Sequence, residues 1–171
     1  LDWSRSQTGK LEVIPSAFSI SSAFQEISDD LYSLAKSKGV YIQVEVKEDF
    51  IVYADKNMIN SVLNNLITNA IKFSNRRNTV TLSATKDGDF CEVSVHDDGI
   101  GIPKENLTSL FRIDSDVRTN GTENEKGTGL GLILCREFVE KNHGRIRVES
   151  NYGYGSTFYF TLPLAKEHLS E

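Results

Sequence analysis

Three polar side chains on one predicted helix have the types and spacing to bind a metal ion and phosphate. Asn65, Asn69 and Lys72 stand at i, i+4 and i+7, so they share a helical face. An amide oxygen is a hard, neutral ligand for Mg²⁺, which commonly combines one or two protein oxygens with phosphates and water. Lys72 would then meet phosphate. Taken alone, the spacing also fits a solvated helix face, since Asn60 and Asn64 lie on the same helix.

A second candidate site follows a β-rich run, at Asp97-Asp98-Gly99-Ile100-Gly101. The carboxylate lies where the backbone is expected to turn sharply, and glycines lack the Cβ atoms that would keep a planar ligand away. A carboxylate accepts hydrogen bonds without donating any, which suits the exocyclic amino group of adenine. An ordinary Asp-Gly turn at a strand end is the alternative.

A third candidate site is the glycine run KGTGLGL, from Lys126 to Leu132, at the start of a predicted helix. The free N–H groups and the positive dipole end of a helix N-terminus favour phosphate. The GxGxG spacing and the polar loop before it differ from the dinucleotide-binding fingerprint. The sequence also has no GxxxxGK[ST], HRD or DFG motif. These absences exclude the P-loop and protein-kinase routes to ATP.

The first half of the chain predicts the elements that hold the asparagine-rich helix. Ser21 or Ser22 is expected to cap a helix that ends at Gly39, and residues 40–47 then alternate apolar and polar side chains as a half-buried strand does. The short run IVYA predicts another strand. Asp55 is a natural N-cap for the strongest helix, which should run to about Ser74.

The second half predicts two strand pairs around a loop. TVTLSAT and FCEVSVHD should form a hairpin through Asp87-Gly88-Asp89. The polar segment 103–126 is expected to be a functional lid, with a disordered loop as the alternative, and a helix should follow from Gly127 to about Asn142. RIRVES and STFYFTL predict the last two strands of the domain. This order predicts an α/β two-layer sandwich, with one mixed, mostly antiparallel sheet covered on one face by three helices.

Composition places the chain among globular proteins. The 171 residues, 39% hydrophobic and 25% charged, fit a single domain, and no apolar run is long enough for a membrane span. The net charge of -5 argues against nucleic acid as a partner. Cys91 and Cys135 are expected to be buried free thiols in a reducing compartment. The start at Leu1 without an initiator Met suggests a fragment of a longer polypeptide.

Five ordered motifs, NNLITNAIKFSN, DDGIGIP, LFRIDS, KGTGLGL and GYGSTF, resemble the N, G1, F, G2 and G3 boxes of histidine kinase catalytic domains. The resemblance covers residues 11–163 and implies the Bergerat ATP-binding sandwich. It makes residues 1–10 the end of a dimerisation helix with its linker, and leaves 164–171 as a polar C-terminal tail. ATP and Mg²⁺ are the implied ligands.

The resemblance also implies a role for each matching residue. Asn69 would bind Mg²⁺, Asp97 would bind adenine, Phe73 would flank the nucleotide, and Thr157 would approach the adenine side near Asp97. Asn65, Lys72 and Arg112 would act in catalysis. The implied nucleotide-binding residues are Asn65, Asn69, Lys72, Phe73, Asp97, Gly99, Gly101, Ile102, Lys126, Gly127, Thr128, Gly129, Leu130, Gly131 and Thr157.

The sequence departs from the family pattern at two places. Phe111 stands alone before Arg112, where the F box often has two aromatic residues, so the lid is expected to be short. Asp98 occupies a position where the family commonly has Asn.

Three functions share this fold: phosphoryl transfer to a histidine, ATP hydrolysis that drives a conformational change, and nucleotide binding without chemistry. Gyrase-like and chaperone-like relatives carry Glu one turn before the Mg²⁺-binding Asn, whereas this sequence has Asn65, which favours the kinase. His96, His143 and His168 lie outside any His-Glu or His-Asp helical box. The acceptor histidine is therefore expected on an upstream dimerisation and phosphotransfer domain.

That expectation extends to partners and location. The full-length protein would be a homodimer that passes phosphate to a response regulator receiver domain, and the fragment would be monomeric. Its expected location is the cytoplasm, as part of a bacterial sensor. It should phosphorylate only in trans.

Overall fold

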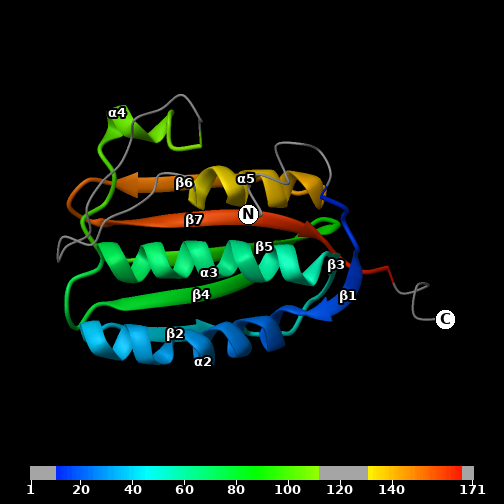
Figure 1. Ribbon diagram of the computed structural model, residues 1–171, viewed down its shortest axis with the longest axis horizontal. Helices are drawn as coiled ribbons and strands as arrows, with labels where there is room; N and C mark the ends of the chain where they lie inside the picture. Colours follow the sequence, from blue (N-terminus) through cyan, green and yellow to red (C-terminus); the bar gives the residue numbers. More distant parts are fainter. Residues whose placement is uncertain (1–10, 112–130, 167–171) are drawn as a thin grey trace.

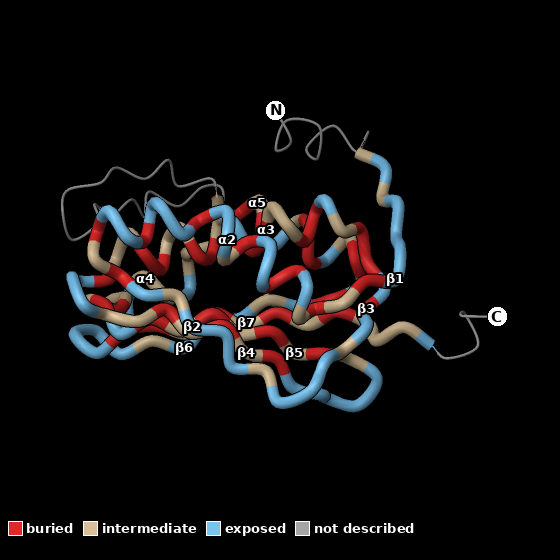
Figure 2. Tube along the Cα trace, turned by 90° about the horizontal axis from the view of Figure 1, so that it is seen from below, coloured by how far each residue is buried: buried red, intermediate tan, exposed pale blue. Residues whose placement is uncertain are grey.

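A computed structural model describes residues 11–111 and 131–166 (Figure 1). In the described residues, three long helices lie over one face of a sheet, as seen edge-on in Figure 2. They are α2 (Ile20–Lys38), α3 (Lys56–Phe73) and α5 (Gly131–Lys141). The predicted two-layer arrangement is confirmed.

The main sheet has five strands in the order β2-β4-β5-β7-β6. β2 is parallel to β4 and the other neighbours are antiparallel, which confirms the predicted mixed, mostly antiparallel sheet. The strands are β2 (Tyr41–Glu45), β4 (Thr79–Asp87), β5 (Phe90–Asp97), β6 (Ile146–Asn151) and β7 (Gly155–Pro163).

A second sheet of two strands was not predicted. β1 (Ser16–Ser19) pairs antiparallel with β3 (Ile51–Ala54), so the prediction of one sheet is wrong. Each strand is four residues long, and their pairing joins segments that are far apart in sequence, which local periodicity does not report. Beyond β7, Leu164 forms an antiparallel bridge with Val52 and the Ala165 N–H donates to the Ile51 carbonyl, so the chain continues along this small sheet.

The core lies between the helices and the inner face of the main sheet. Alternate residues of the central strands are buried, and α3 is buried along the face that its apolar spacing predicted. Cys91 and Cys135 are buried free thiols, as expected, and burial raises the pKa of each to about 12.

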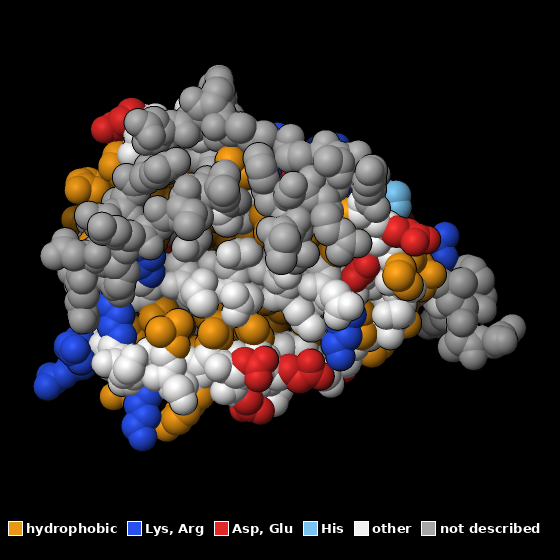
Figure 3. Space-filling view, in the orientation of Figure 1, with side chains coloured by type: hydrophobic (Ala, Val, Ile, Leu, Met, Phe, Trp, Pro, Cys, Tyr) orange, Lys and Arg blue, Asp and Glu red, His pale blue; other side chains and the backbone are white. Residues whose placement is uncertain are grey.

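The face of α2 that points away from the sheet exposes Glu26, Asp29 and Asp30, and Figure 3 shows acidic side chains gathered over this helix.

The helix ends that lie within the described residues agree with the sequence except at the start of α2. Its N-cap is Ser19, because the Ser19 hydroxyl accepts from the Ser22 N–H at 3.1 Å and donates to Asp49 at 2.6 Å. The predicted cap at Ser21 or Ser22 is therefore wrong by two or three residues. Gly39 ends α2 with φ of 76° and Asp55 caps α3, both as predicted.

α5 begins at Gly131 in the described residues and ends at Lys141. The left-handed residue after it is His143, with φ of 66°, and Gly144 follows because a Cβ there would lie 1.8 Å from the Thr161 carbonyl oxygen.

One short helix, α4 (Lys104–Leu107), lies in the segment expected to be a lid. Four residues are too few to show helical periodicity in a sequence. None of the helices within 11–111 and 131–166 has the length and apolarity needed to cross a membrane.

Candidate functional site

The polar face of α3 meets the start of α5. The Asn65 amide nitrogen donates to the Ser61 carbonyl at 3.1 Å, and its amide oxygen lies 3.1 Å from the position of a Cβ on Gly131. Gly131 thus allows α5 to begin beside Asn65. The asparagine helix and the last glycine of the KGTGLGL run thus lie together in the fold.

The other two polar residues of this face lie toward the C-terminal end of α3. Asn69 is partly buried, and no hydrogen bond engages its side chain in the described part of the chain. The Lys72 ammonium lies 5.0 Å from the centre of the Phe73 ring, a cation–π contact. The predicted nucleotide-flanking aromatic and the predicted phosphate contact are therefore neighbours.

Asp97 ends β5 and is 4% exposed. Desolvation by burial raises its pKa from 3.8 to about 6, against the lowering effects of the Gly99 N–H and of His96. The Gly99 N–H donates to Oδ1 at 2.9 Å. A carboxylate has more acceptor positions than this bond uses, so Asp97 can accept a further hydrogen bond from a ligand amino group.

The loop after Asp97 is fixed against α3 on one side. A Cβ on Gly99 would lie 2.1 Å from the Phe73 carbonyl oxygen, and the Ile100 N–H donates to that oxygen at 3.2 Å. Only a residue without a side chain fits this approach. The end of α3 and the Asp97 loop are therefore one packed unit.

The turn between β6 and β7 fixes the other side of the loop. Gly101, with φ of 74°, has the Asn151 carbonyl oxygen 2.3 Å from its Cβ position. On Gly155, with φ of 106°, an added Cβ would lie 2.2 Å from the Asp97 carbonyl oxygen. The Ile102 N–H donates to the Ser150 hydroxyl at 2.8 Å, so the predicted residue Ile102 belongs to the loop through its backbone.

Sequence reasoning missed Ser156. Asp97 and Ser156 are paired across β5 and β7, so their side chains share the helix-covered face. Ser156 is 6% exposed, and its hydroxyl lies 2.8 Å from that of Ser150. The alternation of Ser156, Phe158 and Phe160 was a signal for this inward position, but only the strand register links it to Asp97.

The structure does not bring Thr157 to the Asp97 side chain. Thr157 is paired with His96, and its hydroxyl lies 2.7 Å from the His96 Nδ1. Since successive residues of a strand point to opposite faces, Thr157 lies on the outer face of the sheet when Ser156 lies on the inner one. The expected approach of Thr157 to Asp97 fails for this reason.

The remaining predicted residues lie outside the described ranges. They are Arg112, Lys126, Gly127, Thr128, Gly129 and Leu130.

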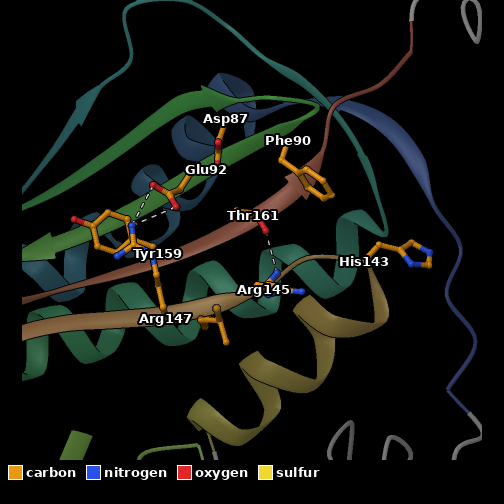
Figure 4. A pocket seen from close by; sticks show the side chains of 9 residues that line it. Asp87, Phe90, Glu92, His143, Arg145, Arg147, Tyr159 and Thr161 are labelled. Atoms are coloured by element: carbon orange, nitrogen blue, oxygen red, sulfur yellow. Dashed lines mark hydrogen bonds and ion pairs between the residues drawn. The ribbon is translucent and has the colours of Figure 1, made fainter. Parts of the chain in front are cut away.

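A pocket of about 490 Å³ lies on the outer face of the sheet, away from all of these residues (Figure 4). Its walls include Glu92, Arg147 and Tyr159, with the Arg147 guanidinium 3.8 Å from the centre of the Tyr159 ring and 3.4 Å from Glu92. These charges already have partners. The chemistry of the loop and α3 therefore identifies the site, and this pocket does not.

Comparison with known proteins decides the family. Residues 54–166 match the family model of the histidine kinase-, DNA gyrase B- and HSP90-like ATPases. The chain belongs to this family. Together with the sensor histidine kinases to which it is similar, this match identifies the chain as a histidine kinase ATP-binding domain, as the five motifs predicted.

Named relatives agree. The chain is 32% identical over 166 residues to the adaptive-response sensory kinase SasA of Synechococcus elongatus, covering 96% of this chain and 42% of SasA. It is also 32% identical to the sensor histidine kinase RcsC of Escherichia coli, covering 17% of that protein. The chain thus spans less than half the length of either relative.

Solved structures show the same fold. The catalytic domain of the histidine kinase ThkA is 28% identical, with a TM-score of 0.75 over 90% of this chain and 96% of that one. Full-length ShkA in complex with AMPPNP has a TM-score of 0.82 at 24% identity, over 96% of this chain and 34% of ShkA.

Proposed function

We propose that this domain binds Mg-ATP, with adenine at Asp97, and transfers the γ-phosphoryl group to a histidine on an upstream dimerisation domain. The observation that carries the proposal is the buried Asp97 carboxyl group, at the end of β5, in a loop that glycines fix against α3 and the β6–β7 turn. A buried carboxyl group that retains acceptor capacity needs a donor, and the adenine amino group is one.

The donor set on α3 fits Mg²⁺. Asn69 offers a hard oxygen and has no hydrogen-bond partner in the described part of the chain. When bound, Mg²⁺ would neutralise charge on the phosphates. Asn69 would hold the ion at the face of α3 that also carries Asn65 and Lys72.

Phosphoryl transfer depends on positioning and charge neutralisation more than on a reactive side chain. Asn65 and Gly131 bring the polar face of α3 to the first described turn of α5, and the N-terminal end of a helix suits phosphate. Lys72 would add positive charge, and Arg112 and the glycines from 127 to 129 are proposed to act on the same phosphates. Phe73 would flank the nucleotide.

ATP hydrolysis is the second candidate function, and Asn65 argues against it. An amide is neither a base nor an acid near neutral pH, so Asn65 cannot activate water as a carboxylate would. A nucleotide-binding module without chemistry is the third candidate, and the presence of Asn69 and Lys72 argues against it.

The whole protein is proposed to be a cytoplasmic, two-component sensor kinase or the cytoplasmic part of one. Residues 1–10 would complete its dimerisation helix and linker, and residues 164–171 would form a C-terminal tail. The full-length protein would be a homodimer whose phosphohistidine supplies a response regulator receiver domain, whereas the fragment alone would be monomeric.

The metal proposal is tested by titrating the chain with ATP in the presence and absence of Mg²⁺. Asn69→Ala should lose the increase in affinity that Mg²⁺ gives and keep the metal-independent affinity, because the adenine contact is untouched. Asn64→Ala is the matched control, since Asn64 is exposed on the same helix. Equal Mg²⁺ dependence in Asn69→Ala and the control would refute the metal role of Asn69.

A further inference from the structure

Three side chains form a hydrogen-bonded chain behind the Asp97 loop, on the outer face of the sheet. The His96 Nδ1 of β5 lies 2.7 Å from the Thr157 hydroxyl of β7, and its Nε2 lies 2.9 Å from Asp98 Oδ1. Asp98 is the first residue after β5 and one of the two places where the sequence departs from the family pattern. We name this set the outer-face triad.

The chemistry of the three side chains determines which group donates and which accepts in each hydrogen bond of the triad. The Asp98 carboxylate only accepts, so the His96 Nε2 must carry a hydrogen. In a neutral imidazole the Nδ1 is then an acceptor, and the Thr157 hydroxyl donates to it. A protonated imidazole would donate from Nδ1 to the same hydroxyl, which also accepts. The geometry therefore persists in both protonation states of His96.

Asp98, the residue that the triad holds, lies between two residues of the proposed adenine site. Asp98 is preceded by Asp97 and followed by Gly99, whose N–H donates to the Asp97 carboxyl group. A Cβ at Gly155 would lie 2.9 Å from the Asp98 Cα and 2.2 Å from the Asp97 carbonyl oxygen. The Asp97 loop therefore also contacts the β6–β7 turn. A shift of Asp98 would therefore move both the Asp97 carboxyl group and the Gly99 N–H.

We propose that Asp98, His96 and Thr157 are positioning residues that hold the Asp97 turn from the outer face of the sheet and thereby set the affinity of the domain for adenine nucleotides. This inference rests on the proposed binding of adenine at Asp97. It also accounts for the Thr157 hydroxyl, which the strand register directs away from Asp97.

The triad contributes geometry more than stability. The side chains of His96 and Asp98 are 43% and 58% exposed, and exposed ion pairs contribute little to folding. Their loss should therefore change nucleotide affinity while leaving the melting temperature nearly unchanged. A change of packing in the core would instead lower the melting temperature and leave the nucleotide affinity nearly unchanged.

The test measures the affinity of the chain for Mg-ADP and Mg-ATP. Asp98→Ala and Thr157→Val should each weaken binding by about three- to tenfold, the loss expected when one or two hydrogen bonds no longer hold the turn. Asp98→Asn and Thr157→Ser keep an acceptor and a hydroxyl, and should bind within about twofold of the wild type. Ser94→Ala, on the same face of β5, is the matched control.

A second measurement does not depend on nucleotide. Nitrogen chemical shifts of His96 in the nucleotide-free domain, above neutral pH, should show the tautomer with hydrogen on Nε2, and Asp98→Ala should change them. If the wild type fails to bind nucleotide, the proposed function is wrong. If it binds and Asp98→Ala and Thr157→Val bind equally well, or Asp98→Asn loses as much as Asp98→Ala, the positioning role is overturned.

Discussion

At the scale of single residues, Asp97 shows an opposition between stability and function. Burial raises its pKa to about 6, which means that the folded domain disfavours the ionised carboxylate that the proposed adenine contact requires. Gly99 and Ser156 donate backbone N–H groups that offset part of this effect. A bound adenine amino group would offset more, so nucleotide should stabilise the ionised form.

The first prediction is that Asp97→Asn stabilises the nucleotide-free domain and abolishes binding. The folded pKa lies above the unfolded value of 3.8, so ionisation costs stability above about pH 6, and the cost vanishes near pH 4. A shift of this size is on the order of 2–3 kcal/mol at neutral pH, and a neutral amide avoids it. Urea unfolding of both proteins at several pH values measures the difference.

The same substitution tests the site because it separates folding from binding. Wild-type affinity for ATP should fall as the pH drops through the range in which Asp97 is protonated, whereas Asp97→Asn should bind weakly at every pH. Asp87→Asn, at the exposed end of β4, is the control. Nucleotide affinity unchanged in Asp97→Asn would remove Asp97 from the site.

At the scale of elements, the β6–β7 turn determines where the Asp97 backbone lies. Gly153 and Gly155 both have positive φ, at 92° and 106°. A Cβ on Gly153 meets nothing within 4 Å, whereas one on Gly155 meets the Asp97 carbonyl oxygen. The Gly153 N–H donates to the Ile100 carbonyl at 2.6 Å, a bond that alanine would keep, so the two glycines differ in whether an added side chain would displace the Asp97 backbone.

The second prediction compares Gly153→Ala with Gly155→Ala. Gly153→Ala should lose about 1 kcal/mol of stability from strain alone and keep its nucleotide affinity. Gly155→Ala should lose more stability and at least about tenfold in affinity, because β7 must move away from Asp97. Thermal unfolding and nucleotide titration measure both. Equal affinities in the two variants would show that this turn does not hold the site.

A buried polar contact joins the far ends of α3 and α5. The Asn142 amide oxygen accepts from the Asp55 N–H at 2.7 Å, and Asp55 accepts from the N–H groups of Ile14 and Met58. Asn142 is 2% exposed. The helices that carry Asn65 and Gly131 are thus fixed relative to each other at the end opposite the site.

The third prediction is that Asn142→Ala destabilises the domain by about 1–3 kcal/mol, since the Asp55 N–H would be left buried without a partner. Glu140→Ala, on the exposed side of α5, should change stability by less than about 0.5 kcal/mol. Denaturant unfolding of the two variants gives the comparison. Equal stabilities would mean that the contact carries no net energy.

Local patterns predicted the elements well, and two of the misses, the β1–β3 pair and the face on which Thr157 lies, share one physical cause. The helix from Asp55 and the hairpin through Gly88 follow from period and turn chemistry, which are local in sequence. The β1–β3 pair and the opposite orientations of Ser156 and Thr157 depend on strand register, which distant residues fix. Family motifs located Asp97 and Asn69, but only the register showed which hydroxyl lies beside Asp97.

At the scale of the whole molecule, the sheet separates two environments. The helix side holds Asp97, Asn69 and the start of α5, and the outer side holds the triad that includes His96 and Thr157. Described histidines His96 and His143 lie outside the helical motifs that carry phosphate in the proposed partner. The domain is thus proposed to supply ATP and the acceptor to come from another domain.

The most direct test incubates the chain with ATP labelled at the γ-phosphate, with and without a dimerisation domain that carries an acceptor histidine. The account predicts little free phosphate and no label on the chain alone, and acid-labile label on the added domain, lost in Asp97→Asn. Rapid release of phosphate with no label on that domain would contradict it and identify a hydrolase.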